Sequence, residues 1–415
     1  MAIKHEIMKR ALYILIILVT TLSCTEPYAI QNNTFEDVLV IEATVTNELK
    51  KQEIKITRTF QLEEKDPTFE TNATVYITDD LGNQYNFEEE NGKYISEFEF
   101  QAIPDRQYQL FVNTSNGKEY NSTIEELPSI SNQVELNVNA TNLLGVDGVE
   151  ITANSFDPTN RSKYYRFEYE ETYKIVSPYW TSDSLNLSYN PTNFIVSTWI
   201  TQKSYNSKVC YNTEYSNEIL LANTTAISED KITDFPVRFI PQNNSIIAYR
   251  YSILVKQFVQ NLEAHTFYSK LKDLSSTNTS LLSPKQQGFI EGNINNKTDN
   301  SEKVIGFFDV SSVFKKRIFF NYNDFFEGEA YPNYSFACST YSYNPFLEIE
   351  DCNMEPPPKN KPPYCEFGKY ALYLALVQYE SEIYFDVIDG MFVTVKPICG
   401  ECNRLWSTEV PDFWE

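Results

Sequence analysis

Hydrophobic and polar side chains alternate over short runs from residue 37 onward. Ile54 to Thr57 is one such run, and others recur up to residue 128 at roughly the 8–12-residue spacing of small β-sandwiches. Turn signals separate the runs, among them Asn91-Gly92, because both positions tolerate positive φ. The pattern predicts an immunoglobulin- or transthyretin-like β-sandwich over residues 37–128.

Residues 129–415 continue the alternation over a longer stretch. The aromatic run Tyr164–Tyr169 is typical of a strand in a fibronectin-type sandwich. Only residues 261–275 have helical periodicity, with Asn261 as the N-cap. We therefore expect a mainly β fold, in which the first sandwich is followed by a larger fibronectin-like domain with one helical insertion. Further strands are predicted at Val304–Val310, Arg317–Asn321, Tyr370–Gln378, Glu382–Val387 and Met391–Val395.

The N-terminus has the features of an export signal. A basic stretch at residues 8–10 precedes an unbroken apolar run from Ala11 to Val19. A run of about ten residues is too short to span roughly 30 Å of hydrocarbon, so it predicts a signal peptide over residues 1–23. No later apolar run reaches the length of a membrane-spanning helix. Met1 and Met8 both remain open as the start.

Ser23 and Cys24 follow the apolar run, and a small residue directly before a cysteine resembles a bacterial lipobox. That resemblance implies cleavage before Cys24 and acylation of its thiol with palmitate-type chains. Several acyl chains would hold the protein on a membrane. Residues 24–36 would then form a flexible tether. The alternative is an ordinary secretory signal with a chance cysteine.

Composition excludes several classes of protein. Lys plus Arg is 34 and Asp plus Glu is 57, which gives a net charge of -23. Such an acidic chain is unsuited to nucleic acid or to anionic lipid, since both require a cationic surface. Its 29 Tyr and 28 Phe are too many aromatic rings for a disordered acidic chain. The two histidines leave little basis for a metal site, and we expect no cofactor.

Cysteine usage indicates an oxidising compartment. Beyond Cys24, six cysteines remain, and six allow 15 pairings, so the sequence leaves the connectivity open. They are Cys210, Cys338, Cys352, Cys365, Cys399 and Cys402. The C-x-x-C pair Cys399 and Cys402 fits a structural disulfide, a redox pair or a zinc site. We favour structural disulfides, because no amphipathic helix is predicted after the motif and no second pair repeats its spacing. A bridge from Cys352 to Cys365 would close a Pro-rich loop within the Cys-rich part 338–402.

The sequence contains no recognisable catalytic constellation. His265 is the only histidine after the signal, and it lies beside the apolar face of its predicted helix. No nucleophile motif accompanies it. The many carboxylates leave a carboxylate-based hydrolase open, although no pair stands out. Tyr179, Trp180 and Trp199 are candidate contacts for a ligand or partner, and their alternative role is packing in the core.

Seven short stretches together resemble a family. They are Leu39–Ala43, Glu218–Leu221, Tyr249–Ile253, Gly292–Ile294, Glu302–Phe308, the pair Cys399 and Cys402, and Pro411–Trp414. With the signal ending at Cys24, their order resembles an uncharacterised family of Bacteroidota outer-membrane lipoproteins, a domain of unknown function. Genes of that family often lie beside TonB-dependent receptors of the starch-utilisation type.

The resemblance implies a non-enzymatic outer-membrane lipoprotein. We expect a lid, capture or scaffold subunit of a TonB-dependent transporter or of another outer-membrane β-barrel complex. The barrel is the expected partner and the lipid anchor the expected link to the membrane, with the cell surface favoured over the periplasmic face. The alternatives are a carbohydrate- or peptide-binding surface module and a carboxylate-based hydrolase.

Overall fold

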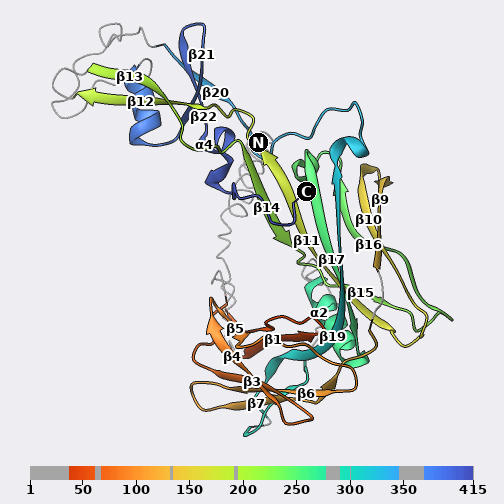
Figure 1. Ribbon diagram of the computed structural model, residues 1–415. Coiled ribbons are helices and arrows are strands. Elements are labelled where there is room, and N and C mark those ends of the chain that lie inside the picture. Colours follow the sequence, from red (N-terminus) through yellow and green to blue (C-terminus); the bar gives the residue numbers. More distant parts are fainter. Residues whose placement is uncertain are drawn as a thin grey trace, which may run out of the picture.

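Figure 1 presents a computed structural model of the chain. It describes residues 37–60, 67–130, 134–190, 195–276, 290–299, 301–344 and 369–414. The expected signal, Cys24, the tether, Cys352 and Cys365 lie outside the described residues. The prediction of a mainly β fold is confirmed, and the strands form a first block, a second block and a projecting distal module.

The first block is a curved antiparallel sheet around a single core. Its strands are β1 (Leu39–Thr46), β2 (Glu53–Arg58), β3 (Thr74–Asp79), β4 (Gln84–Glu90), β5 (Lys93–Ser96), β6 (Gln107–Asn113), β7 (Glu119–Ser122) and β8 (Glu125–Glu126). The main path runs β1-β2-β5-β4-β3-β6-β7. Alternate side chains such as Ile54 and Ile56 are buried in this core, so the period-2 pattern correctly marks the inward face.

Two strands from much later in the chain complete the first block. β18 (Ile294–Asn296) pairs with β7, and the start of β19 (Val304–Asn321) pairs in parallel with β1. The block therefore contains strands from outside residues 37–128. Local alternation cannot reveal such a pairing, because it depends on contacts between distant parts of the chain.

Two glycines allow the strands to meet. A Cβ on Gly306 would lie 2.1 Å from the carbonyl oxygen of Ile41, and one on Gly292 would lie 1.6 Å from that of Gly306. Between them, the buried amide of Asn293 accepts from the N–H of Phe308 at 2.7 Å and donates to its C=O at 3.0 Å. The Asn293 side chain thus satisfies the two backbone groups of Phe308 that a neighbouring strand would otherwise pair with, at the place where β18 and β19 approach each other.

β19 continues beyond the first block into the second (Figure 1). Its residues 304–311 pair with β1, and residues 312–321 pair antiparallel with β17 (Arg250–Gln260). The prediction of two separate strands, at Val304–Val310 and Arg317–Asn321, is wrong, because both stretches belong to the single strand β19. The serines and lysines between them resemble a break, but their backbone stays in the ladder and Lys315 forms an ion pair with Glu48 at 2.6 Å.

The second block is a sandwich of two sheets. One sheet has the order β16-β10-β9, from β16 (Asp230–Pro241), β10 (Val146–Asp157) and β9 (Val134–Leu143). The other contains β14 (Val209–Tyr215), β11 (Tyr164–Val176), β17 and β19, and β15 (Leu220–Asn223) extends along β11. The core between the sheets includes Ile151, Phe167 and Ile253, one from each of three central strands.

Helix α2 (Leu262–Ser276) confirms the predicted helical insertion. The Asn261 side chain accepts from the N–H of Ala264 at 2.7 Å, as expected of an N-cap. The predicted apolar face packs against Phe307 of β19. His265 is half buried, and its ring lies against Tyr164.

The distal module is built from two separate stretches of the chain. The first forms the hairpin β12 (Asp183–Asn190) and β13 (Ile195–Gln202). The second forms the sheet β20 (Thr340–Tyr343), β22 (Met391–Val395) and β21 (Ile383–Ile388), with α3 (Lys369–Tyr373) and α4 (Pro397–Gly400). Leu185, Leu372 and Tyr384 form the core between them.

One strand prediction in this module is wrong. Tyr370–Gln378 is not a strand, because it forms α3 and a following π-helical turn at Leu374–Gln378. Its buried residues Leu372 and Ala375 are three apart, which places them on one face of a helix. The C-x-x-C motif also lies in helical structure, namely α4 and the 3-10 turn Cys402–Arg404.

Replacing Gly292 with Ala should lower the free energy of unfolding by about 3 kcal/mol or more, because its Cβ has no room beside the Gly306 carbonyl. Gly117→Ala is the control. Gly117 has a φ of +84° but open space around its missing Cβ, so strain alone should cost about 1–2 kcal/mol. Urea unfolding of both variants checks the difference, and equal losses would contradict the close contact.

Candidate functional site

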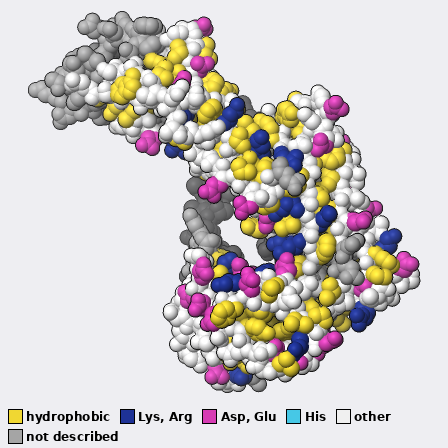
Figure 2. All heavy atoms as spheres, in the orientation of Figure 1, with side chains coloured by type: hydrophobic (Ala, Val, Ile, Leu, Met, Phe, Trp, Pro, Cys, Tyr) yellow, Lys and Arg dark blue, Asp and Glu magenta, His cyan; other side chains and the backbone are white. Residues whose placement is uncertain are grey.

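A groove of about 820 Å³ lies between the first block, the second block and helix α2. Figure 2 shows the molecule hollowed there, with charged side chains around the opening. This volume is within the range of about 300–1,000 Å³ that is usual for ligand pockets. The groove exists because β19 brings the outer face of β1 and β2 opposite β11 and α2.

The groove combines an apolar lining with balanced charge. Phe267 and Leu271 of α2 supply apolar side chains. On the opposite side, Lys55 lies 3.8 Å from Glu42 and Lys93 lies 2.7 Å from Glu53. These exposed ion pairs contribute little stability, but each of the two lysines has a glutamate beside it that balances its charge. The lining therefore suits a neutral or zwitterionic ligand better than an anion.

Arg166 of β11 forms a buried cluster beside the groove. Its guanidinium lies 4.3 Å from the ring centroid of Phe258 and 4.5 Å from that of Tyr268. It also forms an ion pair with Glu168 and lies 3.9 Å from the carboxylate of Asp309. Burial alone would lower the pKa of Arg166, but these neighbours raise it overall. The arginine is thus a fixed cation that links β11, α2 and β19.

The Asp309 carboxyl is fully buried and hydrogen-bonded to neighbouring side chains. Burial raises its pKa, against the opposing attraction of Arg166. The side chains of Gln260 and Ser311 both donate to it, at 2.6 and 2.7 Å. Because it is buried and already hydrogen-bonded, Asp309 helps to anchor the crossing strand. No cluster of three or more potential metal ligands occurs in the described ranges.

The predicted contact residues lie in the distal module and not in the groove. Tyr179 donates its backbone N–H to Cys399 at 3.1 Å, and its ring packs edge-on against Phe385. Trp180 is partly buried, and its Nε1 has no hydrogen-bond partner among described residues. Trp199 on β13 is 49% exposed. Of the three, Trp199 is the one whose side chain is largely open to a partner.

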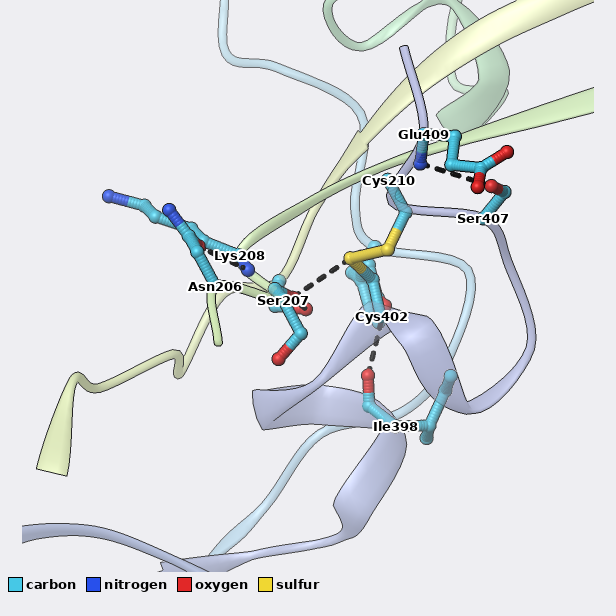
Figure 3. Close-up of a disulfide and its surroundings, with 10 residues drawn as sticks. Asn206, Ser207, Lys208, Cys210, Ile398, Cys402, Ser407 and Glu409 are labelled. Atoms are coloured by element: carbon cyan, nitrogen blue, oxygen red, sulfur yellow. Dashed lines mark hydrogen bonds between the residues drawn. A yellow bond between two sulfur atoms is a disulfide. The ribbon is translucent and has the colours of Figure 1, made fainter. Parts of the chain in front are cut away.

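The C-x-x-C cysteines are bonded to two different partners and not to each other. Cys402 is bonded to Cys210 of β14, and Cys399 to Cys338. The interpretation as structural disulfides is therefore confirmed. Figure 3 shows the first bridge, where Cys402 also lies against the Ser207 carbonyl. The disulfides attach α4 and the 3-10 turn that follows it, at the base of the distal module, to parts of the chain 61 and 192 residues away.

Glu401, between these two cysteines, adds a buried ion pair. Its carboxylate lies 3.0 Å from Nζ of Lys203, and both side chains are almost fully buried. Tyr205 donates a hydrogen bond to it at 2.8 Å, and Arg404 lies 3.2 Å away. Burial would raise the pKa of Glu401, but the bonds from Lys203 and Tyr205 keep it below its usual value. We call the two disulfides and this ion pair the clamp.

Sequence reasoning missed the clamp's ion pair and the surface it supports. The overlooked signal is an absence of charge, because no charged residue occurs from Ser184 to Gln202. Asp183 and Lys203 border this stretch, and together they span the hairpin β12–β13. The chain, of which 22% of residues are charged, has another uncharged run of similar length at residues 330–347.

These features define a class of protein: two β blocks joined by one shared strand, with a clamped module projecting from the second block. The chain belongs to the family described as a domain of unknown function, DUF4249, whose model matches residues 25–317. A search of the curated proteins found no match. The family match covers the glycine contact and all of the hairpin, and it ends within β19.

Removing the longer bridge with Cys210→Ala and Cys402→Ala should lower the free energy of unfolding by about 3–5 kcal/mol, because the bridge closes a separation of 192 residues. It should also speed proteolysis near the exposed Tyr205, which lies beside the clamp. Thermal unfolding measures the loss of stability, and limited proteolysis with chymotrypsin measures the faster cleavage.

The pair Cys338→Ala and Cys399→Ala is the matched control. Its bridge spans 61 residues, so the chain-entropy model gives a loss about 1 kcal/mol smaller. A larger loss from the shorter bridge would contradict an entropic role for the clamp.

Proposed function

We propose that this protein is a non-enzymatic, lipid-anchored accessory subunit of an outer-membrane β-barrel complex, such as a TonB-dependent transporter, in a member of the Bacteroidota. It docks on the barrel through the distal module. The observation that carries the proposal is the uncharged hairpin β12–β13, which exposes aromatic and aliphatic side chains on an otherwise acidic protein.

The chemistry of the hairpin favours a protein partner. Trp199 and Ile200 are each about half exposed, at 49% and 48%. Tyr379, Val387 and Ile388 of the same module are also exposed. Protein interfaces are depleted of charge at their centre and enriched in aromatic residues. In Figure 2 the described part of the module carries several acidic side chains beside its apolar ones, and acidic and basic side chains both occur around the groove.

The anchor is the second part of the proposal. No helix in the described part of the chain is long and apolar enough to cross a membrane. Acylation of Cys24 would provide attachment, and the residues up to 36 would connect the anchor to β1. The acidic body is repelled by an anionic lipid surface, so a protein contact is the favoured way to orient it there.

Three of the carboxylates with shifted pKa values have structural surroundings, which favours a binding role over catalysis. Asp309 and Glu401 are held by buried cations, and their positions are explained by strand crossing and by the clamp. Asp157, with a pKa of about 2, accepts hydrogen bonds from Thr159 and Ser162 in a turn. Each of these groups has a structural task.

The docking proposal predicts the result of a capture experiment. A tagged full-length chain, purified from detergent-solubilised outer membranes, should recover one large β-barrel protein in stoichiometric amount. Trp199→Ala should lower that recovery about 10-fold or more, as expected of an aromatic residue at the centre of an interface. Mass spectrometry identifies and quantifies the barrel.

Phe98→Ala is the control, because Phe98 is an exposed aromatic residue of the first block, away from the hairpin. Its recovery should equal that of the unchanged protein. Recovery of the tagged chain alone, with no barrel, would count against an accessory subunit.

The groove supports a second candidate function, a peptide- or carbohydrate-binding module. The observation in its favour is the cavity of about 820 Å³ with a mixed apolar and zwitterionic lining. Calorimetry with short peptides and oligosaccharides tests it on the full chain. Leu271→Arg, which places a long charged side chain in the groove, should abolish any heat of binding that this site generates.

A further inference from the structure

Among the described residues, the hairpin β12–β13 has an open edge at β13. It forms a sheet of two strands, and within the described ranges β13 pairs with β12 alone. A strand edge carries a row of backbone N–H and C=O groups that can pair with another strand. The question is therefore which residues of β13 direct these groups outward.

The register of β12 with β13 and one backbone hydrogen bond show which residues these are. The backbone N–H of Lys203 donates to the carbonyl of Ser182 at 2.8 Å, so this position is a hydrogen-bonded pair of the antiparallel ladder. Asp183 is opposite Gln202, and the pairing continues without a bulge to the end of the hairpin. Hydrogen-bonded and non-hydrogen-bonded pairs alternate along such a ladder.

It follows that alternate residues of β13 direct their N–H and C=O away from β12. They are Val196, Thr198, Ile200 and Gln202. A second observation agrees with this phase: the N–H of Asp183, opposite Gln202, donates away from β13 to the hydroxyl of Thr181. The outward groups face an edge with no ladder partner in the described structure.

The sequence of β13 lacks the usual protection against pairing, and no described strand covers its edge. Natural edge strands are protected by lysine, proline, bulges or covering elements. β13 has the sequence IVSTWITQ, with no charge, no proline and no glycine, and it is rich in β-branched residues. Its register with β12 is regular over the whole hairpin. Such a strand is suited to pairing with another strand.

We propose that the open edge of β13 receives an extended strand from the barrel partner, which adds to the hairpin as a third strand. This inference rests on the proposed docking function and specifies its chemistry. The added segment is uncharged, because Ile200 and Trp199 would strip water from any charged side chain placed beside them. Main-chain hydrogen bonds provide affinity, and the side chains of β13 provide selectivity.

The clamp makes this edge an effective receptor. Lys203 follows β13 directly, and its ammonium is fixed on Glu401 at 3.0 Å. On the other side of the hairpin, Leu185 of β12 is packed in the core of the module. Both strands are thus fixed at their base before a partner arrives, so less conformational entropy is lost on binding.

The test uses a substitution that removes one outward N–H and leaves the hairpin intact. Ile200→Pro is such a change, because proline is tolerated in an edge strand where the N–H points to solvent. Ile200→Ala is the matched control, since it shortens the side chain but keeps the N–H. Both are made in the full-length tagged chain, and thermal unfolding verifies that both fold.

The readout is recovery of the barrel from detergent-solubilised outer membranes. Ile200→Pro should lower recovery about 10-fold or more, and Ile200→Ala should lower it less than about 3-fold. Hydrogen exchange provides the second readout. In the isolated chain the amides of Thr198, Ile200 and Gln202 should exchange quickly, and in the captured complex they should become protected.

The outcomes separate the two proposals. If Trp199→Ala abolishes capture but Ile200→Pro behaves like Ile200→Ala, docking through the module stands and strand addition is overturned. If no barrel is recovered by the unchanged chain, the proposed function itself fails. If the outward amides are already protected in the isolated chain, or if it dimerises through this edge, strand addition by a partner is overturned as well.

Discussion

Strand β19 is hydrogen-bonded to β1 along its first half and to β17 along its second, and the arrangement of both blocks depends on this shared strand. Its crossing requires Gly306 and Gly292 to touch backbone without a Cβ. The buried Asn293 amide then satisfies both backbone groups of Phe308. Since an unpaired buried backbone group is costly, this one side chain makes the close approach of the strands possible.

The groove is a consequence of the same crossing. β19 brings α2 and β11 over the outer face of β1 and β2, and the space left between them is the cavity. Arg166 and Asp309 lie where these elements meet, and their burial is tolerated because each has charged and hydrogen-bonding neighbours. The buried charge cluster and the cavity therefore come from one junction.

The distal module follows a different principle. Its core is small. The Cys210–Cys402 disulfide attaches it to β14 of the second block, and the Cys338–Cys399 disulfide and the ion pair of Lys203 with Glu401 join segments within the module. From this attachment the uncharged hairpin projects away from the two blocks (Figure 1).

The sequence by itself determined the local elements, because period-2 alternation and the Asn261 cap depend on neighbours along the chain. It identified the strands of the first block and helix α2, and it indicated disulfides. Only the tertiary structure decided that β18 and β19 return to the first block, that Cys402 bonds Cys210, and that Tyr370–Gln378 is helical. The clamp and the open edge of β13 were decided at that level too, because each depends on which residues far apart in the chain come together and which find no neighbour.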